Sequence, residues 1–220
     1  MKNKAPIPHV EMAAFHYELP SNRIAMTPLE HRDASKLLVR KNKSLQHSSY
    51  HLLPELLPTK SLLVFNNTRV IAARLRFKKS TGGEIEIFLL EPADGNYACL
   101  NDLEQSTWKC LVGGAKKWKN DELLHASNDI HNNKLQAQLV SKKADHCLIN
   151  FQWSSRLPFE KIIAETGTIP LPPYIKREAT EADQHRYQTV YAAHEGSVAA
   201  PTAGLHFTES LINNLSAKGI

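Results

Sequence analysis

The chain has 220 residues, of which 42% are hydrophobic and 22% charged, and its formal net charge is +5. That length and balance suit one large or two small globular domains. A membrane-spanning helix is not expected, because the longest apolar runs (61–65 and 86–90) are too short to cross a bilayer. The start of the chain carries lysines but no apolar stretch of signal-peptide length, so we expect a cytoplasmic protein.

The cysteines and histidines give no sign of a metal centre. Cys99, Cys110 and Cys147 are odd in number and widely spaced, which fits neither a disulfide framework nor a zinc site. The 11 histidines contain no HExxH motif. We therefore expect buried or idle thiols and no metal ligands.

The first 75 residues are predicted to mix short strands with a short helix. Residues 35–41 and 61–66 have the composition of strands, the second of them buried, and 49–57 is typical of a helical turn or two interrupted by prolines. Arg32 and Asp33 directly precede the first strand. An internal ion pair is the structural interpretation of these two residues, and orientation of a substrate is the functional one.

The next 80 residues, from 76 to 155, have an almost purely β pattern. Further strands are predicted at 107–113, 134–142 and 145–153, the last two forming a hairpin. Within 83–92 the side chains alternate with the period of a half-buried strand, Ile85, Ile87 and Leu89 facing one way and Glu84, Glu86 and Phe88 the other. Several short strands at this spacing indicate a small barrel or sandwich.

Helices return after residue 155. Residues 157–167 have helical spacing with Gly167 as the stop, and 208–219 begin at a capping Thr208. Tyr187 and Tyr191 are four residues apart and are expected on one side of a helix, either as a core stripe or as a base-stacking face. The simplest fold is a mixed α/β catalytic domain built from 1–75 and 156–220, with a small barrel-like all-β domain, 76–155, inserted.

Two segments are candidates for a site. Asn66, Thr68 and Arg69 follow the predicted strand at 61–66, and the carboxyl ends of strands face the ligand crevice in open α/β sheets. Residues 198–208 (VAAPTAGLHFT) form an almost uncharged turn that presents His206 beside Gly204, just before a helix. The structural alternatives are an Asn-rich surface turn and a packing histidine.

Basic residues gather at 74–79, 115–119, 141–143 and 174–177. Such clusters suit a polyanionic partner through phosphate contacts, and a solvated basic face is the alternative. The candidate contacts to nucleic acid are Arg74, Lys116, Lys117, Lys176 and Arg177.

Six segments in this order and spacing closely resemble the S-adenosylmethionine:tRNA ribosyltransferase-isomerase family of queuosine biosynthesis. They are TPLEHRDASKLL, LVFNNTRVIAARL, TGGEIEIFLLEP, PLPPYIKR, YQTVYA and GSVAAPTAGLHFT, and the resemblance runs from about Phe15 to the last residue. It implies the two-part fold above and a cytoplasmic enzyme that uses S-adenosylmethionine and tRNA, without a metal or redox cofactor. Separately, we expect a monomer.

The implied reaction moves the ribosyl part of S-adenosylmethionine onto 7-aminomethyl-7-deazaguanine at the tRNA wobble position. Rearrangement gives epoxyqueuosine and releases adenine and methionine. The chain departs from the family at Asn67, where Asp is frequent, and it stops at Ile220, so we expect the C-terminal part of the catalytic domain to be missing.

His206 is the expected acid or base, because a histidine side chain exchanges protons near neutral pH. Arg32, Asp33 and Arg69 are expected to orient the reactants. The expected substrate contacts are Asn66, Thr68, Tyr187, Tyr191, Pro201, Thr202, Gly204 and Phe207. Two alternatives stay open: a catalytically incomplete tRNA-binding protein, and an enzyme that acts on another adenosyl substrate.

Overall fold

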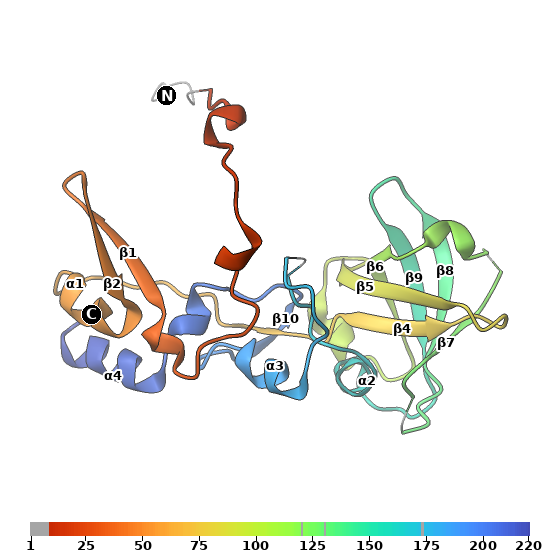
Figure 1. Ribbon diagram of the computed structural model, residues 1–220. Coiled ribbons are helices and arrows are strands. Elements are labelled where there is room, and N and C mark those ends of the chain that lie inside the picture. Colours follow the sequence, from red (N-terminus) through yellow and green to blue (C-terminus); the bar gives the residue numbers. More distant parts are fainter. Residues whose placement is uncertain (1–8, 120, 130, 173) are drawn as a thin grey trace, which may run out of the picture.

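The computed structural model describes residues 9–119, 121–129, 131–172 and 174–220. The molecule is elongated (Figure 1), with a β-hairpin and two helices at one end and a barrel at the other. Two short parallel strands and helix α3 (Glu181–Arg186) lie between these ends. The first described residues project from the middle of the molecule.

Six strands form a closed antiparallel barrel in the order β4-β5-β6-β9-β8-β7. Between residues 76 and 155 the described chain contains, besides these strands, only the short 3₁₀ segments η5 (Tyr97–Asn101) and η6 (Ala115–Lys117). The predicted small all-β barrel is therefore confirmed, as is the mixed α/β class. The barrel strands are β4 (Arg74–Lys78), β5 (Glu84–Pro92), β6 (Gln105–Val112), β7 (Leu124–Ala126), β8 (Gln136–Lys142) and β9 (Cys147–Gln152).

The barrel interior is filled by the alternating side chains that the sequence pattern predicted. Ile85, Ile87 and Leu89 are each 1% exposed or less. Helix α2 (Phe159–Thr166) closes one end of the barrel, and its Phe159 ring lies 5.5 Å from that of Phe151. The helix stops at Gly167, where a Cβ would lie 2.2 Å from the Ala72 carbonyl oxygen.

The opposite end has a much smaller core. The hairpin of β1 (Lys36–Lys41) and β2 (Ser44–Ser49) is followed by η4 (Tyr50–Leu52) and α1 (Leu53–Leu56). Helix α4 (Glu209–Ala217) begins at Thr208, whose hydroxyl accepts a hydrogen bond from the Leu211 amide, as predicted. The buried residues here are Phe207, Leu211 and Leu215. The remaining 3₁₀ segments are η1 (Met12–Phe15), η2 (Ser21–Arg23), η3 (Arg32–Ala34) and η7 (Gly204–His206).

The prediction of a buried strand at 61–66 is wrong. Leu62 and Val64 are 88% and 87% exposed, because this extended segment crosses between the two ends of the molecule and pairs with no strand of the described ranges. The strand comes later, as β3 (Thr68–Val70), and pairs in parallel with β10 (His194–Ser197). Parallel pairing with a distant segment leaves no local pattern in the sequence.

The prediction that Tyr187 and Tyr191 share a helix face is also wrong. Helix α3 starts with a capping box at Thr180 and ends at Arg186, so Tyr187 is its C-cap and Tyr191 lies in a later turn. Gln188 explains the early stop, since its side chain accepts from the Val70 amide at 2.9 Å and donates to the Val70 carbonyl at 2.7 Å. These two bonds hold the chain against β3 instead of in a helix.

The division into a domain of 1–75 and 156–220 and an inserted domain of 76–155 stays a proposal, and residues 1–8 lie outside the described part. The barrel strands start at Arg74, and the barrel core extends to Ile163 in α2. The two core cysteines of the barrel, Cys110 and Cys147, are buried, and burial raises the pKa of both thiols.

Candidate functional site

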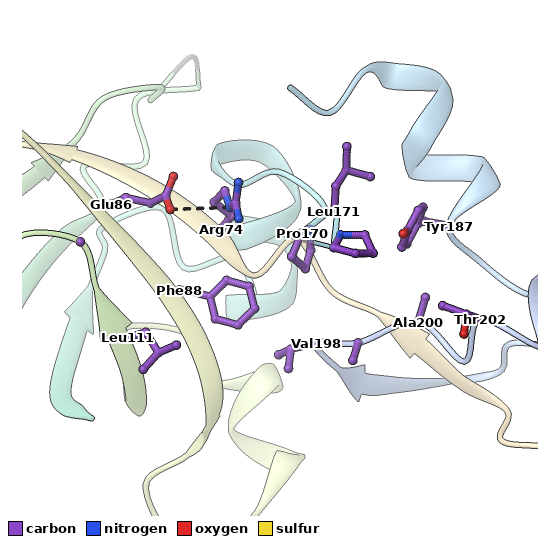
Figure 2. A pocket seen from close by; sticks show the side chains of 13 residues that line it. Arg74, Glu86, Phe88, Leu111, Pro170, Leu171, Tyr187, Val198, Ala200 and Thr202 are labelled. Atoms are coloured by element: carbon purple, nitrogen blue, oxygen red, sulfur yellow. Dashed lines mark ion pairs between the residues drawn. The ribbon is translucent and has the colours of Figure 1, made fainter. Parts of the chain in front are cut away.

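Two cavities lie next to each other between the ends of the molecule and share Tyr187 and Thr202 in their walls. We call the first, of about 530 Å³, the histidine cavity; it is lined mainly by 23–36, 175–187 and the 202–206 turn. We call the second, of about 510 Å³, the barrel-side cavity (Figure 2); it is lined by β4, β5 and β6 and by 170–172 and 198–202. Both have the size of ordinary ligand sites.

His206 lies in the wall of the histidine cavity, at the end of η7. Its Nδ1 is 3.2 Å from the Ala203 carbonyl oxygen. Because a carbonyl oxygen can only accept, Nδ1 carries the proton of the neutral ring and Nε2 is left as the basic nitrogen. The geometry thus fixes a tautomer that can take up a proton at Nε2.

Tyr50 holds His206 in place, and the sequence analysis did not single it out. The two rings stack at a centroid distance of 4.8 Å with 20° between their planes. The Tyr50 hydroxyl donates to the same Ala203 carbonyl at 3.1 Å, and burial raises the pKa of this phenol. Since Tyr50 and Ala203 are 153 positions apart, no local pattern could have indicated the contact.

Gly204 serves the packing of the turn. A Cβ on this glycine would lie 2.1 Å from the hydroxyl oxygen of Tyr191. Tyr191 in turn packs on Phe65 at 4.8 Å, and Phe207 is 6% exposed in the same aromatic group. Pro201 accepts from the Gly204 amide at 2.7 Å. Of the predicted substrate contacts, Tyr191, Pro201, Gly204 and Phe207 thus support the turn behind the two cavities, whereas Thr202 and Tyr187 line them.

Arg32 lies in the histidine cavity, and Asp33 points elsewhere. The Arg32 Nη1 donates to the Gln188 carbonyl at 3.0 Å. Burial lowers the pKa of Arg32, and the positive charge of Arg186 lowers it further. The Asp33 carboxylate accepts from the Thr208 hydroxyl at 3.1 Å, which ties η3 to the start of α4. Asp33 can therefore help to position the residues of the site, but it does not line the histidine cavity.

An ion pair between Arg177 and Asp183 lines the histidine cavity on the side of α3. The Arg177 guanidinium donates to both carboxylate oxygens of Asp183, at 2.6 and 2.9 Å, and its Nε donates to the Met26 carbonyl at 2.9 Å. This pairing holds the pKa of Asp183 well below its usual range, with the Thr180 hydrogen bonds adding to the effect. Arg177 was predicted to contact tRNA, and its donors are used here within the protein.

Tyr187 stands between the two cavities with a neutral side chain. Burial, with smaller contributions from Tyr174 and Asp183, raises the pKa of Tyr187 to about 12. The phenol therefore stays protonated at neutral pH and can donate a hydrogen bond to a ligand in either cavity.

The segment 66–69 lies outside both cavities. The Asn66 side chain accepts from the amide and hydroxyl of Thr68, at 2.9 and 2.7 Å, and so closes a local turn. Arg69 is exposed in the middle of β3, opposite Glu195 on β10. Asn67 accepts through its backbone from the Ala193 amide at 2.8 Å, so its structural contribution does not need a carboxylate.

The predicted tRNA contacts are spread over the molecule. Lys116 and Lys117 are exposed in η6 on the barrel, and Lys176 is exposed beside α3. Arg74 lines the barrel-side cavity next to Glu86, with 3.7 Å between Nε and Oε1. Arg74 and Arg177 each line a cavity together with Tyr187 and Thr202, Arg74 in the barrel-side cavity and Arg177 in the histidine cavity.

Within the described part of the chain no group of three or more His, Cys, Asp or Glu side chains is placed to hold a metal ion. His47 and His51 are four positions apart, but they do not share a helix, because His47 lies on β2 and His51 on η4. None of the helices in the described ranges is long and apolar enough to span a membrane.

Residues 12–220 match the family described as "Queuosine biosynthesis protein". The chain belongs to that family. It is 42% identical over 214 residues to the S-adenosylmethionine:tRNA ribosyltransferase-isomerase of Thermotoga petrophila, and 37% identical over 212 residues to that of an Anaeromyxobacter species. In each case 96% of this chain is aligned. A crystal structure of S-adenosylmethionine tRNA ribosyltransferase from Thermotoga maritima shares 30% identity, covers 93% of this chain and 54% of that one, and gives a TM-score of 0.32.

The queuosine biosynthesis match covers only part of the relatives' length. The chain spans 57% of the Thermotoga petrophila protein and 58% of the Anaeromyxobacter protein. The activity of those longer proteins is therefore only proposed for this chain.

Proposed function

We propose that this chain binds S-adenosylmethionine in the histidine cavity and transfers its ribosyl part to a queuosine-precursor base in tRNA, as a cytoplasmic monomer. The product would be epoxyqueuosine at the wobble position, with release of adenine and methionine. One observation carries the proposal. Arg32, Tyr187 and His206, from three separate family-like segments, line one cavity of about 530 Å³.

The cations of the cavity suit the carboxylate of the methionine part. The positive charge of Arg186 contributes to lowering the pKa of Arg32, and both side chains line the cavity. An anionic group between them would relieve that repulsion and accept charge-assisted hydrogen bonds. Arg186 is itself oriented by the Leu29 and Glu30 carbonyl oxygens, to which its guanidinium donates.

We assign the proton transfer to His206. The positive sulfur of S-adenosylmethionine acidifies the neighbouring ribose C5′ proton, and removing it requires a base. The fixed tautomer leaves Nε2 free for this step, while Tyr50 and Ala203 hold the ring. The apolar turn at 198–204 would exclude water from a reactive intermediate.

Release of free adenine tests the proposal. The chain is incubated with S-adenosylmethionine and tRNA bearing 7-aminomethyl-7-deazaguanine, and adenine is measured by chromatography. Reactions without tRNA and with tRNA carrying guanine at that position are the controls, and a full-length relative shows that the assay works. We expect adenine only with the modified tRNA. Binding of the modified tRNA without adenine release would contradict turnover and leave a tRNA-binding protein.

The tRNA part of the proposal has a separate test in salt dependence. Charge reversal at Lys116, Lys117 or Lys176 is expected to weaken tRNA binding and to reduce the slope of log K against log salt by about 1 for each lost phosphate contact. Lys43→Glu, at the tip of the β1–β2 hairpin, is a matched control. Slopes that stay unchanged in all three variants would mean that these lysines form only a solvated face.

A further inference from the structure

The barrel-side cavity has an apolar surface where a barrel normally faces water. Phe88 on β5 and Leu111 on β6 are paired on the outward face, and Leu111 is 48% exposed. Pro170 and Val198 face them across the cavity (Figure 2). Flat apolar walls around an aromatic ring are suited to the faces of a nucleobase.

One edge of this apolar space is charged. Arg74 and Glu86 lie side by side there (Figure 2), 37% and 42% exposed. Their closest approach of 3.7 Å is longer than a charge-assisted hydrogen bond of about 2.8 Å. Within the described residues the buried Arg74 Nε has no hydrogen-bond partner. The pair therefore offers an acceptor and a donor that a ligand edge can engage together.

A guanine-type base matches this edge. Its N1–H and 2-amino groups are two adjacent donors that a carboxylate can accept, and its O6 is an acceptor for a guanidinium. Adenine presents an acceptor at N1 and a donor at the 6-position, so it would place a lone pair against the Glu86 carboxylate. We propose that Glu86 and Arg74 recognise the 7-deazaguanine base of the tRNA substrate, a specificity that rests on the proposed function above.

The position of the barrel-side cavity determines how the base would be oriented in it. If the N1 and 2-amino edge meets Glu86, the substituent at position 7 lies on the opposite side of the ring system. Tyr187 and Thr202 stand on that side and belong to both cavities (Figure 2). The aminomethyl nitrogen would then face the histidine cavity, where the ribosyl donor is held. A base that reaches this site must leave the anticodon stack, as bases do for enzymes that modify them.

The test compares two anticodon stem-loop RNAs at one salt concentration. One carries 7-aminomethyl-7-deazaguanine at the wobble position, and the other carries the same base without its 2-amino group. Fluorescence anisotropy gives the Kd of each. We expect the wild-type chain to prefer the first RNA about tenfold. Glu86→Gln should reduce that preference to near one, because the amide presents an NH₂ donor in place of one of the two accepting carboxylate oxygens.

Two further variants separate the roles. Arg74→Gln should weaken binding of both RNAs equally and keep the preference, since both bases carry O6. Glu84→Gln, two positions earlier on the same strand, is the matched control and should change neither value. Melting curves establish that each variant is folded.

Retention of the tenfold preference by Glu86→Gln, or its absence in the wild type, would overturn the assignment of the base while leaving adenine release as evidence for the proposed function. Weaker S-adenosylmethionine binding by Glu86→Gln with an unchanged RNA preference would also overturn it, because the cavity would then hold the adenine ring. Absence of adenine release from a chain that still shows the Glu86-dependent preference would refute turnover and support the base site.

Discussion

The barrel and the opposite end of the molecule are stabilised in different ways. Inside the barrel, Trp108, Phe77 and Phe159 have no exposed surface and belong to one continuous apolar cluster. At the other end the buried cluster is Phe207, Leu211 and Leu215. Apolar burial contributes roughly 25 cal/mol of stabilising free energy per Å². It therefore stabilises the barrel much more than it stabilises the region around the histidine cavity.

The histidine cavity is held instead by polar contacts between distant segments. Tyr50 bonds to Ala203, Asp33 to Thr208, and Arg32 to Gln188, all across more than 150 positions of sequence. Such contacts can open locally without unfolding the rest of the molecule. Stability and site geometry should therefore be separable in this protein, and four variants test this.

The largest effect is expected from the barrel core. Phe159→Ala removes a fully buried ring that contacts Phe151 and Trp153, and should lower the free energy of unfolding by about 4 kcal/mol. Urea denaturation measures the loss. Val140→Ala, at a 54% exposed position of the same barrel, should cost less than about 0.5 kcal/mol. A small loss in Phe159→Ala would mean that α2 is not part of the barrel core.

The next effect falls on turnover and not on stability. His206→Gln should slow adenine release about 10²-fold or more, equivalent to about 2.7 kcal/mol, with a nearly unchanged melting temperature. His47→Gln, exposed on β2, is the control and should leave both values unchanged. A folded His206→Gln chain with full turnover would remove the catalytic role, and a lower melting temperature with normal turnover would mark a packing residue.

The third variant tests the Arg177–Asp183 ion pair in the wall of the histidine cavity. Asp183→Asn leaves the Arg177 charge without its partner and weakens the capping of α3, so it should cost about 2 kcal/mol at pH 7. Because the pKa of Asp183 is lowered in the folded state, its stabilisation is present above the unfolded pKa of about 4 and is lost as the pH falls below it.

The difference in melting temperature between wild type and Asp183→Asn should accordingly shrink as the pH is lowered from about 5 toward about 3. Melting curves recorded at intervals of about one pH unit measure it. Glu181→Gln, exposed on the same helix, should show no such trend. A difference that grows in acid would be the opposite of what a lowered pKa requires.

The smallest effect concerns the start of α4. Thr208→Ala removes the cap on the Leu211 amide and the bond to Asp33, at an expected cost of about 1 kcal/mol. Thr208→Ser keeps both hydrogen bonds and should recover most of the loss in thermal melts. An equal loss in Ser and Ala variants would point to the methyl group instead of the hydroxyl.

Features that depend on near neighbours in the chain could be predicted from the amino-acid pattern. The alternation of Ile85, Ile87 and Leu89 predicted a barrel strand, Thr208 the start of α4, and Gly167 the end of α2. These features repeat with the period of a strand or occur at a helix end, so the chain pattern alone carries them. The family-like segments likewise indicated Arg32 and His206, which the structure brings into one cavity.

Features that depend on remote partners became visible only in the folded molecule. The apolar run at 61–66 looked like a buried strand and became an exposed connection, because no strand in the described part of the chain pairs with Leu62 or Val64. Tyr50 became the support of His206 through a contact across more than 150 positions, and Gln188 ended α3 by binding Val70. Composition and periodicity describe a segment's own preferences, whereas these outcomes depend on which surface the folded chain places against it.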